Sequence, residues 1–417
     1  MEKQNVILSR MLFAILVLMI FTGLIIDGPK EALSGLIRLQ LQPGRLINDF
    51  IVSGGIGGTL INAALAGSVG LILLLILKVP LSGPGFAAIF TITGFGFFGK
   101  TPLNILPIIL GVFISARFAG KSLREYILIA LFGTALGPLV SFIVFEFGLT
   151  GVLAVLAGTA GGIFAGFFLP AIAMAMLHLH QGYNLYNMGF SCGFLALFAA
   201  SLVKATGHQF QPAMNWYSGN SLLTVLIIPV LSLFFLIAGV AFEGKTSFRR
   251  FVKILKLPGR LPSDFMDLES MGGSFINLGF IGLAGSAYIF IVGGDFSGPI
   301  IGGLFTVMGF AAFGTHLRNS WPVLTGVILS TLVFGESLSA PGPLLAALFA
   351  TTLAPLAGQF GILPGILAGF IHLFMVLQTG AWQGGMNLYN NGFAGGLTAT
   401  LMVAVIQWYR SNKTDFT

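Results

Sequence analysis

Two repeated asparagine motifs contain residue types that could recognise a polar molecule. NLYNMGF lies at 184–190 and NLYNNGF at 387–393, each beside a long apolar run. If these residues are helical, the two asparagines of each motif lie three positions apart and share one face. A neutral asparagine amide offers two hydrogen-bond donors and two acceptor lone pairs. Two such faces could therefore replace the hydration shell of a small polar solute.

A structural interpretation competes with this binding role. Asn184 and Asn387 would then cap helices, and Tyr186 and Tyr389 would lie in the aromatic belt at a membrane surface. We favour binding because other polar residues also occur in matched pairs. The predicted substrate-binding residues are Asn184, Tyr186, Asn187, Asn387, Tyr389, Asn390, Asn62, Asn277, Asn104, Asn319, Ser82, Ser297, Thr91 and Thr306.

Few ionisable residues lie within the apolar runs, where such residues are costly and usually functional. His372 lies inside one run, and Asp295 precedes the turn Ser297-Gly298-Pro299. We predict that His372 and Asp295 couple solute movement to protons or other cations. Lys100 lies between two apolar segments and would favour an anion if that region reaches a cavity. The two alternating histidines at 178 and 180 lack a third ligand and do not predict a metal site.

Two segments match enzyme motifs letter for letter. GFGFFGKT at 94–101 fits the phosphate-binding loop, and GFSCG at 189–193 fits the nucleophile elbow around Ser191. Both motifs need a preceding β-strand, whereas these segments lie within apolar runs. The second copies read GFAAFGTH at 309–316 and have Ala394 in place of the serine. We therefore predict neither an enzyme nor a bound cofactor.

The elements that must position these residues are predicted to be membrane-spanning helices. Charged residues make up 8% of the 417 positions, against about 25% in soluble domains. A soluble fold could not cover its surface with so few charges, so the lipid bilayer is the expected partner. The net charge of +7 then orients the chain in the membrane and does not indicate nucleic-acid binding. Cys192 is the only cysteine, which excludes an intrachain disulfide.

The sequence contains one unit written twice. PGRL at 43–46 recurs at 258–261, and the ungapped match continues as far as Gly111-Val112 and Gly326-Val327. The two NLYN motifs close the match near the end of each copy. We therefore predict one membrane domain made of a first repeat at 1–205, a connecting loop at 206–220 and a second repeat at 221–417.

Apolar runs of about 20 residues predict five spanning helices in each repeat. They lie at 11–27, 56–77, 124–146, 150–177, 184–204, 222–242, 271–292, 342–360, 361–379 and 387–408. Each repeat also has a pair of runs that are short for a span, at 83–98 with 104–117 and at 298–314 with 319–334. These pairs predict two re-entrant hairpins or broken helices, although short tilted spans, and hence seven crossings per repeat, also fit.

Positive charge predicts that the second repeat is inverted relative to the first. The segment 243–270 has six Lys and Arg residues, and we place it in the cytoplasm with both chain ends. The equivalent segment 28–55 then lies outside, although it contains Lys30, Arg38 and Arg45. We expect an integral protein of a bacterial cytoplasmic membrane.

The whole-chain layout resembles that of urea transporters, which also have two inverted halves of five spans with a re-entrant piece. The local likeness comprises GYN at 182–184 and the NxxxxG pattern from Asn62 to Gly67, while the family's Leu-Pro-x-x-Thr-x-Pro-Phe signature is absent. The chain also resembles an uncharacterised bacterial family of duplicated membrane proteins. The first resemblance implies a shared architecture.

An inverted duplication with interrupted helices is typical of transporters whose substrate site lies at the repeat interface near the bilayer midplane. We therefore predict a secondary transporter of a small polar solute. The alternatives are a passive channel for a small neutral solute, a membrane enzyme and a structural membrane subunit. Assembly into a homo-oligomer is left open.

Overall fold

The computed structural model describes residues 2–210 and 214–414, and within these ranges the chain is helical, without a β-strand. Ten helices of the described chain are long and apolar enough to cross a membrane. The first five are α1 (Glu2–Ile26), α3 (Phe50–Ile76), the interrupted helix α6–η1–α7 (Leu123–Gly133, Thr134–Leu136 and Gly137–Phe145), α8 (Gly151–His180) and α9 (Asn187–Ala205). This result confirms the predicted all-α, polytopic fold.

The second five helices repeat the order of the first five. They are α10 (Leu222–Glu243), α13 (Met271–Ile291), the interrupted helix α16–η2–α17 (Pro341–Phe349, Ala350–Leu353 and Ala354–Phe360), α18 (Ile362–Trp382) and α19 (Asn390–Thr414). A 3₁₀ segment therefore interrupts the same helix in both repeats.

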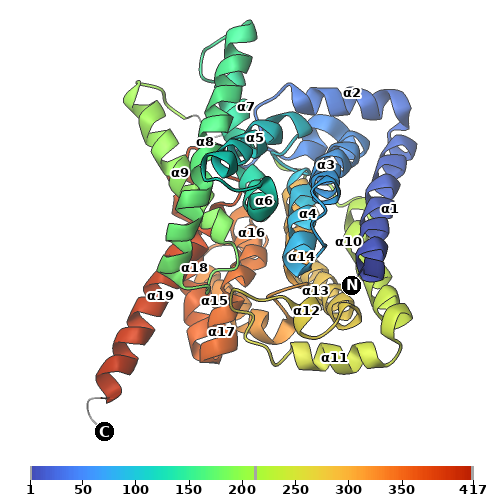
Figure 1. The fold of residues 1–417 in the computed structure, drawn as a ribbon, viewed down its shortest axis with the longest axis vertical. Coiled ribbons are helices and arrows are strands. Elements are labelled where there is room, and N and C mark those ends of the chain that lie inside the picture. The colour runs from blue at the N-terminus through green and yellow to red at the C-terminus, as the bar shows by residue number, and fades with distance from the viewer. Residues whose placement is uncertain (1, 211–213, 415–417) are drawn as a thin grey trace.

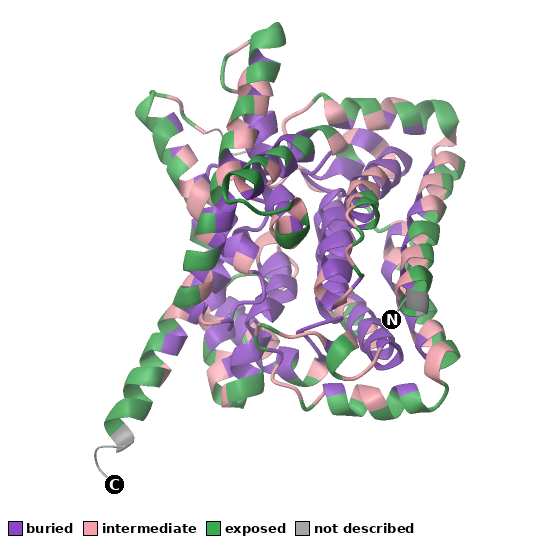
Figure 2. Cartoon of the chain, viewed as in Figure 1, coloured by how far each residue is buried: buried purple, intermediate pink, exposed green. Residues whose placement is uncertain are grey.

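Two pairs of short helices lie at the predicted breaks. The pairs are α4 (Gly83–Phe95) with α5 (Pro102–Phe118), and α14 (Gly298–Phe310) with α15 (Leu317–Val333). At 1.5 Å per residue, the 13 residues of α4 extend about 20 Å, which is less than the roughly 30 Å of a hydrocarbon core. Helices α4 and α14 pack together at the centre of the molecule, and Figure 2 shows both buried along their length.

The two central helices each begin against the other repeat. The backbone N–H of Gly298, at the start of α14, donates to the Asp49 carboxylate at 3.0 Å. The N–H of Gly83, at the start of α4, donates to Asp264 at 2.9 Å. Where α4 and α14 cross, a Cβ on Gly94 would lie 2.5 Å from the carbonyl oxygen of Gly302, so this crossing needs glycine.

Asp49 lies just outside the membrane-spanning segments, at the N-cap of α3. Burial raises the pKa of its carboxyl to about 6, although hydrogen bonds from the backbone N–H groups of Tyr217, Ile51 and Gly298 act in the opposite direction. Burial likewise raises the pKa of Asp264 to about 6. The two equivalent carboxyl groups therefore have similar surroundings in the two repeats.

Two amphipathic helices mark opposite ends of the molecule. In Figure 1, α2 (Gly28–Gln40) lies across the top and α11 (Thr246–Ile254) across the bottom, with α1 and α10 upright between them. Because α2 and α11 hold equivalent places in the two repeats, the repeats have opposite orientations. Large apolar side chains on α1, α8 and α10 are exposed, as expected for surfaces that face lipid.

Candidate functional site

Four of the predicted asparagines hold the unwound backbone that follows α4 and α14. The Asn62 amide donates to the carbonyls of Gly96 and Lys100, both at 2.8 Å. Asn277 makes the equivalent bonds to Ala311 and Thr315, at 2.9 and 2.7 Å. These bonds satisfy carbonyl groups that the interrupted helices leave free.

Asn104 and Asn319 act on the other side of the same breaks. Each forms a capping box at the start of its helix, Asn104 with Thr101 in α5 and Asn319 with His316 in α15. Ser82 and Ser297 are the N-caps of α4 and α14. None of these six predicted residues, and neither Thr91 nor Thr306, lines either of the two large cavities described below.

The NLYN motifs form the linkers between the last two helices of each repeat. Helix α9 begins at Asn187 and α19 at Asn390, so Asn184 and Asn387 lie outside the helices. The expectation of two asparagines on one helix face is therefore wrong. Asn184 donates to the carbonyl of Gly392 at 3.1 Å and accepts the N–H of Tyr186. This asparagine joins the two repeats.

The linkers dock on the interrupted helices of the opposite repeat. The N–H of Leu185 donates to the carbonyl of Thr352 in η2, at 2.9 Å. The N–H of Leu388 donates to Ala135 in η1, at 3.1 Å. Each linker is therefore hydrogen-bonded to the 3₁₀ segment that interrupts a helix of the other repeat.

Glycine and phenylalanine in the motifs make α9 and α19 cross closely. A Cβ on Gly189 would lie 2.8 Å from the Cα of Gly392, and the same holds in reverse. Phe393 of α19 packs over Gly193 of α9, and Phe190 packs over Gly396. This part of the motif serves helix packing.

Asn187 and Asn390 face the cavities while also anchoring their helices. The Asn187 amide donates to the carbonyl of Ala173, and the Asn390 amide to that of Val376, at 3.1 and 3.0 Å. Asn390 also accepts from Thr379 and Gln383.

A cluster of aromatic rings lies between the repeats. The rings of Tyr186 and Tyr389 are 5.1 Å apart, centroid to centroid. Tyr186 packs against Phe310 at 4.3 Å, and Tyr389 packs against Phe95 at 4.7 Å. Phe349 contacts Tyr186 and Phe95. Both tyrosines are buried, so they do not belong to an interfacial aromatic belt. We call these five residues the aromatic barrier.

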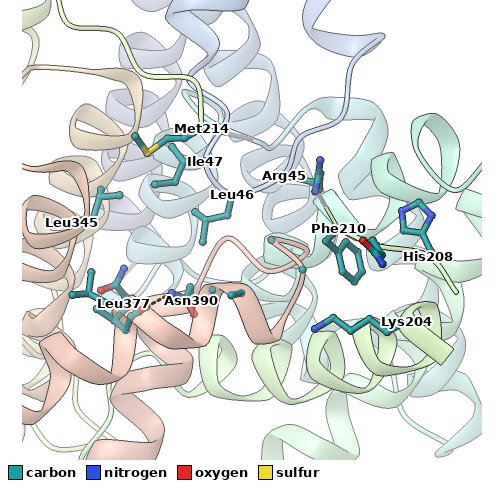
Figure 3. Close-up of a pocket in the computed structure, with 18 of the residues that line it drawn as sticks. Arg45, Leu46, Ile47, Lys204, His208, Phe210, Met214, Leu345, Leu377 and Asn390 are labelled. Carbon is teal, nitrogen blue, oxygen red and sulfur yellow. Dashed lines mark hydrogen bonds between the residues drawn. The ribbon is translucent and has the colours of Figure 1, made fainter. Parts of the chain in front are cut away.

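Two large cavities are lined by residues of both repeats, and the second of them borders this barrier. The first cavity has a volume of about 790 Å³ and is lined by the loop at 45–47, the segment at 207–210 and parts of α16 and α18 (Figure 3). Asn390 also lines it. The second cavity has a volume of about 570 Å³, and its lining includes Asn187 and both tyrosines of the barrier.

The two cavities occupy equivalent places in the two repeats. Arg45 and Leu46 line the first, and their counterparts in the repeated PGRL motif, Arg260 and Leu261, line the second. Each cavity joins this loop of one repeat to the last two spans of the other. These loops follow α2 and α11, which mark opposite ends of the molecule (Figure 1).

The charged side chains that line the cavities are basic. Figure 3 shows Arg45, His208 and Lys204 gathered around Phe210 in the first cavity. Arg260 and His178 line the second. No described aspartate or glutamate lines either cavity, although Glu146 pairs with Arg45 at 2.6 Å. The sequence prediction missed these cations, and the exact recurrence of PGRL in two loops was the signal for the arginines.

The two predicted coupling residues have different surroundings. His372 is buried in α18, and its Nε2 lies 3.1 Å from the Oδ1 of Asn391, which lines the first cavity. Asp295 precedes α14, accepts the indole N–H of Trp216 at 3.1 Å and lines neither cavity.

Comparisons with known proteins give one family match. The profile of a family described as "Protein of unknown function (DUF1576)" matches residues 28–205 and 243–408, one segment in each repeat. The match supports the expected family of duplicated membrane proteins and gives no support to the urea-transporter resemblance. No curated protein matches, and no solved structure matches.

Proposed function

This chain belongs to the DUF1576 family, and we propose that it is a secondary transporter that moves a small polar solute along the interface between its two repeats. The observation that carries this proposal is the pair of equivalent cavities, each of which is lined by residues of both repeats. In transporters built from inverted repeats, the two repeats exchange conformations and so open the site to each side in turn. Cavities of this size suit a small solute.

The aromatic barrier favours a carrier over an open channel. A channel needs a continuous polar path, whereas buried rings at centroid distances of 4.3 to 5.1 Å pack against one another between the repeats. The barrier rings come from linkers and helices of both repeats. A relative movement of the repeats would therefore separate the rings on one side and close them on the other.

Asn187 and Asn390 are the predicted binding residues with the strongest support, because each lines a cavity. Tyr186 and Tyr389 would form the gate between them. The remaining asparagines support the site by holding the breaks and linkers. Of the predicted coupling residues, His372 is supported by its contact with a cavity residue, whereas Asp295 has no such contact.

Charge supports a cytoplasmic position for α11 and for both chain ends. Helix α11 and the loop after it contain Arg249, Arg250, Lys253, Lys256 and Arg260. Positive segments of this kind are typical of the cytoplasmic side of a membrane.

Flux into liposomes tests the proposal. Purified protein is reconstituted and offered urea, acetamide, chloride, nitrate, formate and glycolate one at a time, with and without a pH gradient. We expect saturable, protein-dependent uptake of at least one solute, with accumulation against its gradient when the pH gradient is applied. Uptake that never saturates and never exceeds equilibrium would indicate the neutral-solute channel instead, and no uptake of any solute would contradict both.

A further inference from the structure

Lys100 is a lysine buried at the break between α4 and α5. Its side chain is fully buried, and its Nζ donates to the hydroxyl oxygen of Thr134 at 2.7 Å. The Nζ also lies 4.9 Å from the centroid of the Phe95 ring. Asn62 holds the backbone at this position through the carbonyl of Lys100 itself. The amine therefore has a fixed place.

This amine has no counter-charge in the described part of the chain. No carboxylate of residues 2–210 or 214–414 lies within 4.0 Å of the Nζ. The titratable group that faces the amine is Cys192 of α9, and Tyr389 lies beyond the Phe95 ring. An ammonium group has three N–H donors, of which Thr134 accepts one. The amine is therefore buried without an opposite charge beside it.

Lys100 lies directly behind the aromatic barrier. Phe95, over which the amine sits, is a barrier residue that packs against Tyr389. Gly99, the preceding residue, packs against Leu388, which neighbours Tyr389. The Phe95 ring therefore contacts both the amine and Tyr389, which lines the second cavity.

The charge of both cavities points to the same class of solute. Their basic lining residues are arginine, lysine and histidine, no described carboxylate lines them, and one of the arginines, Arg45, pairs with Glu146. A path lined by one sign of charge concentrates ions of the opposite sign. An anion that reaches the barrier would lose its water there and would need a positive partner.

We propose that the transported solute is a small anion and that Lys100 is its partner within the membrane, binding a proton when the anion binds. This inference rests on the transport function proposed above. The anion stabilises the ammonium form, and the ammonium form stabilises the bound anion. Because such coupling is reciprocal, each ligand raises the affinity for the other. A monovalent anion and a proton then cross together without net charge.

Only the first repeat supplies this amine. The equivalent position in the second repeat is Thr315. One lysine at the interface predicts one proton for each anion.

Binding measurements test the pairing without transport. Protein in detergent is heated with nitrate, formate, glycolate or acetamide between pH 5.5 and 8.5. We expect at least one anion to raise the melting temperature, more strongly at low pH, and to draw protons from a weakly buffered solution. Lys100→Thr, which installs the residue of the second repeat, should weaken anion binding on the order of a hundredfold, because a buried charge loses its partner. Lys30→Met, at an exposed lysine of α2, is the matched control and should bind like the wild type.

Flux measurements with an internal pH dye separate the two proposals. We expect one proton to enter with each anion, and Lys100→Thr to abolish this coupled uptake. If Lys100→Thr does not fold, Lys100→Arg provides the test, because a guanidinium keeps its proton and should leave anion binding independent of pH. Uptake of neutral amides alone, or anion uptake without protons, would overturn the role of Lys100 and leave the transporter standing. The absence of any protein-dependent flux would contradict both the transport function and the role of Lys100.

Discussion

Single residues decide whether the asparagine motifs bind solute or only shape the fold. The amides of Asn184 and Asn387 donate to other residues of the chain, Gly392 and Gln383, whereas Asn187 and Asn390 reach the cavities. The sequence showed both pairs as equivalent candidates. It could not show that each helix begins at the second asparagine, because that start depends on contacts of the linker with the other repeat.

Replacing both cavity asparagines should therefore reduce transport. We expect Asn187→Ala with Asn390→Ala to lower flux at least about tenfold, because each lost hydrogen bond to a solute contributes about 1 kcal/mol. The matched control is Ser201→Ala with Thr400→Ala, on the same two helices but outside both cavities. Unchanged flux in a variant that melts like the wild type would remove these asparagines from the site.

Asp49 predicts a dependence of stability on pH. Its pKa of about 6 in the folded chain exceeds the model-compound value of 3.8, so the folded state binds this proton more tightly than the unfolded state does. The contribution of Asp49 to stability is therefore greatest below pH 4 and decreases as the pH rises to 6, by about 3 kcal/mol in total. This contribution is measured by comparing the free energy of unfolding of the wild type and of Asp49→Asn from pH 4 to 7. A constant difference between the two proteins would contradict the prediction.

At the scale of helices, the close crossing of α9 and α19 limits which residues can replace the glycines at the contact. Gly189→Ala places a Cβ 2.8 Å from a backbone atom of the partner helix, so the helices must separate. We expect a loss of about 1–3 kcal/mol of stability, as for other overpacked contacts. Gly161→Ala on α8 is the control, because its Cβ would meet the flexible end of Ile143. Equal melting temperatures for the two variants would show that the crossing tolerates a methyl group.

The helices themselves were largely predictable. Hydropathy and length indicated the ten spans, and the repeat of Ser-Gly-Pro indicated where α4 and α14 begin. Pairing across the repeats was not predictable. The contact of Asp49 with Gly298 joins residues far apart in sequence, and no local sequence pattern predicts this contact. Lys100 was visible in the sequence as a cation between apolar segments, but its burial depends on five separate helices and linkers.

At the scale of the whole molecule, the two cavities should open to opposite sides of the membrane. Ile47→Cys and Ser263→Cys place thiols in the first and second cavities, each in a Cys192→Ala background. A membrane-impermeant thiol reagent should reach Ile47→Cys from outside the cell and Ser263→Cys from the cytoplasm. Lys256→Cys, after α11, should react from the cytoplasm and serves to report orientation. Labelling of both cavity positions from the same side would contradict the inverted arrangement.

The exchange of aspartates between the repeats has a consequence for how such a protein is made. The first amide of α4 donates to a carboxylate of the second repeat, and the first amide of α14 donates to a carboxylate of the first. A half produced alone would leave the first amide of its central helix without this carboxylate acceptor. To form this contact, such a half would need a second copy inserted in the opposite orientation in the same bilayer. A single chain that contains both halves ensures that each half always meets an oppositely oriented partner.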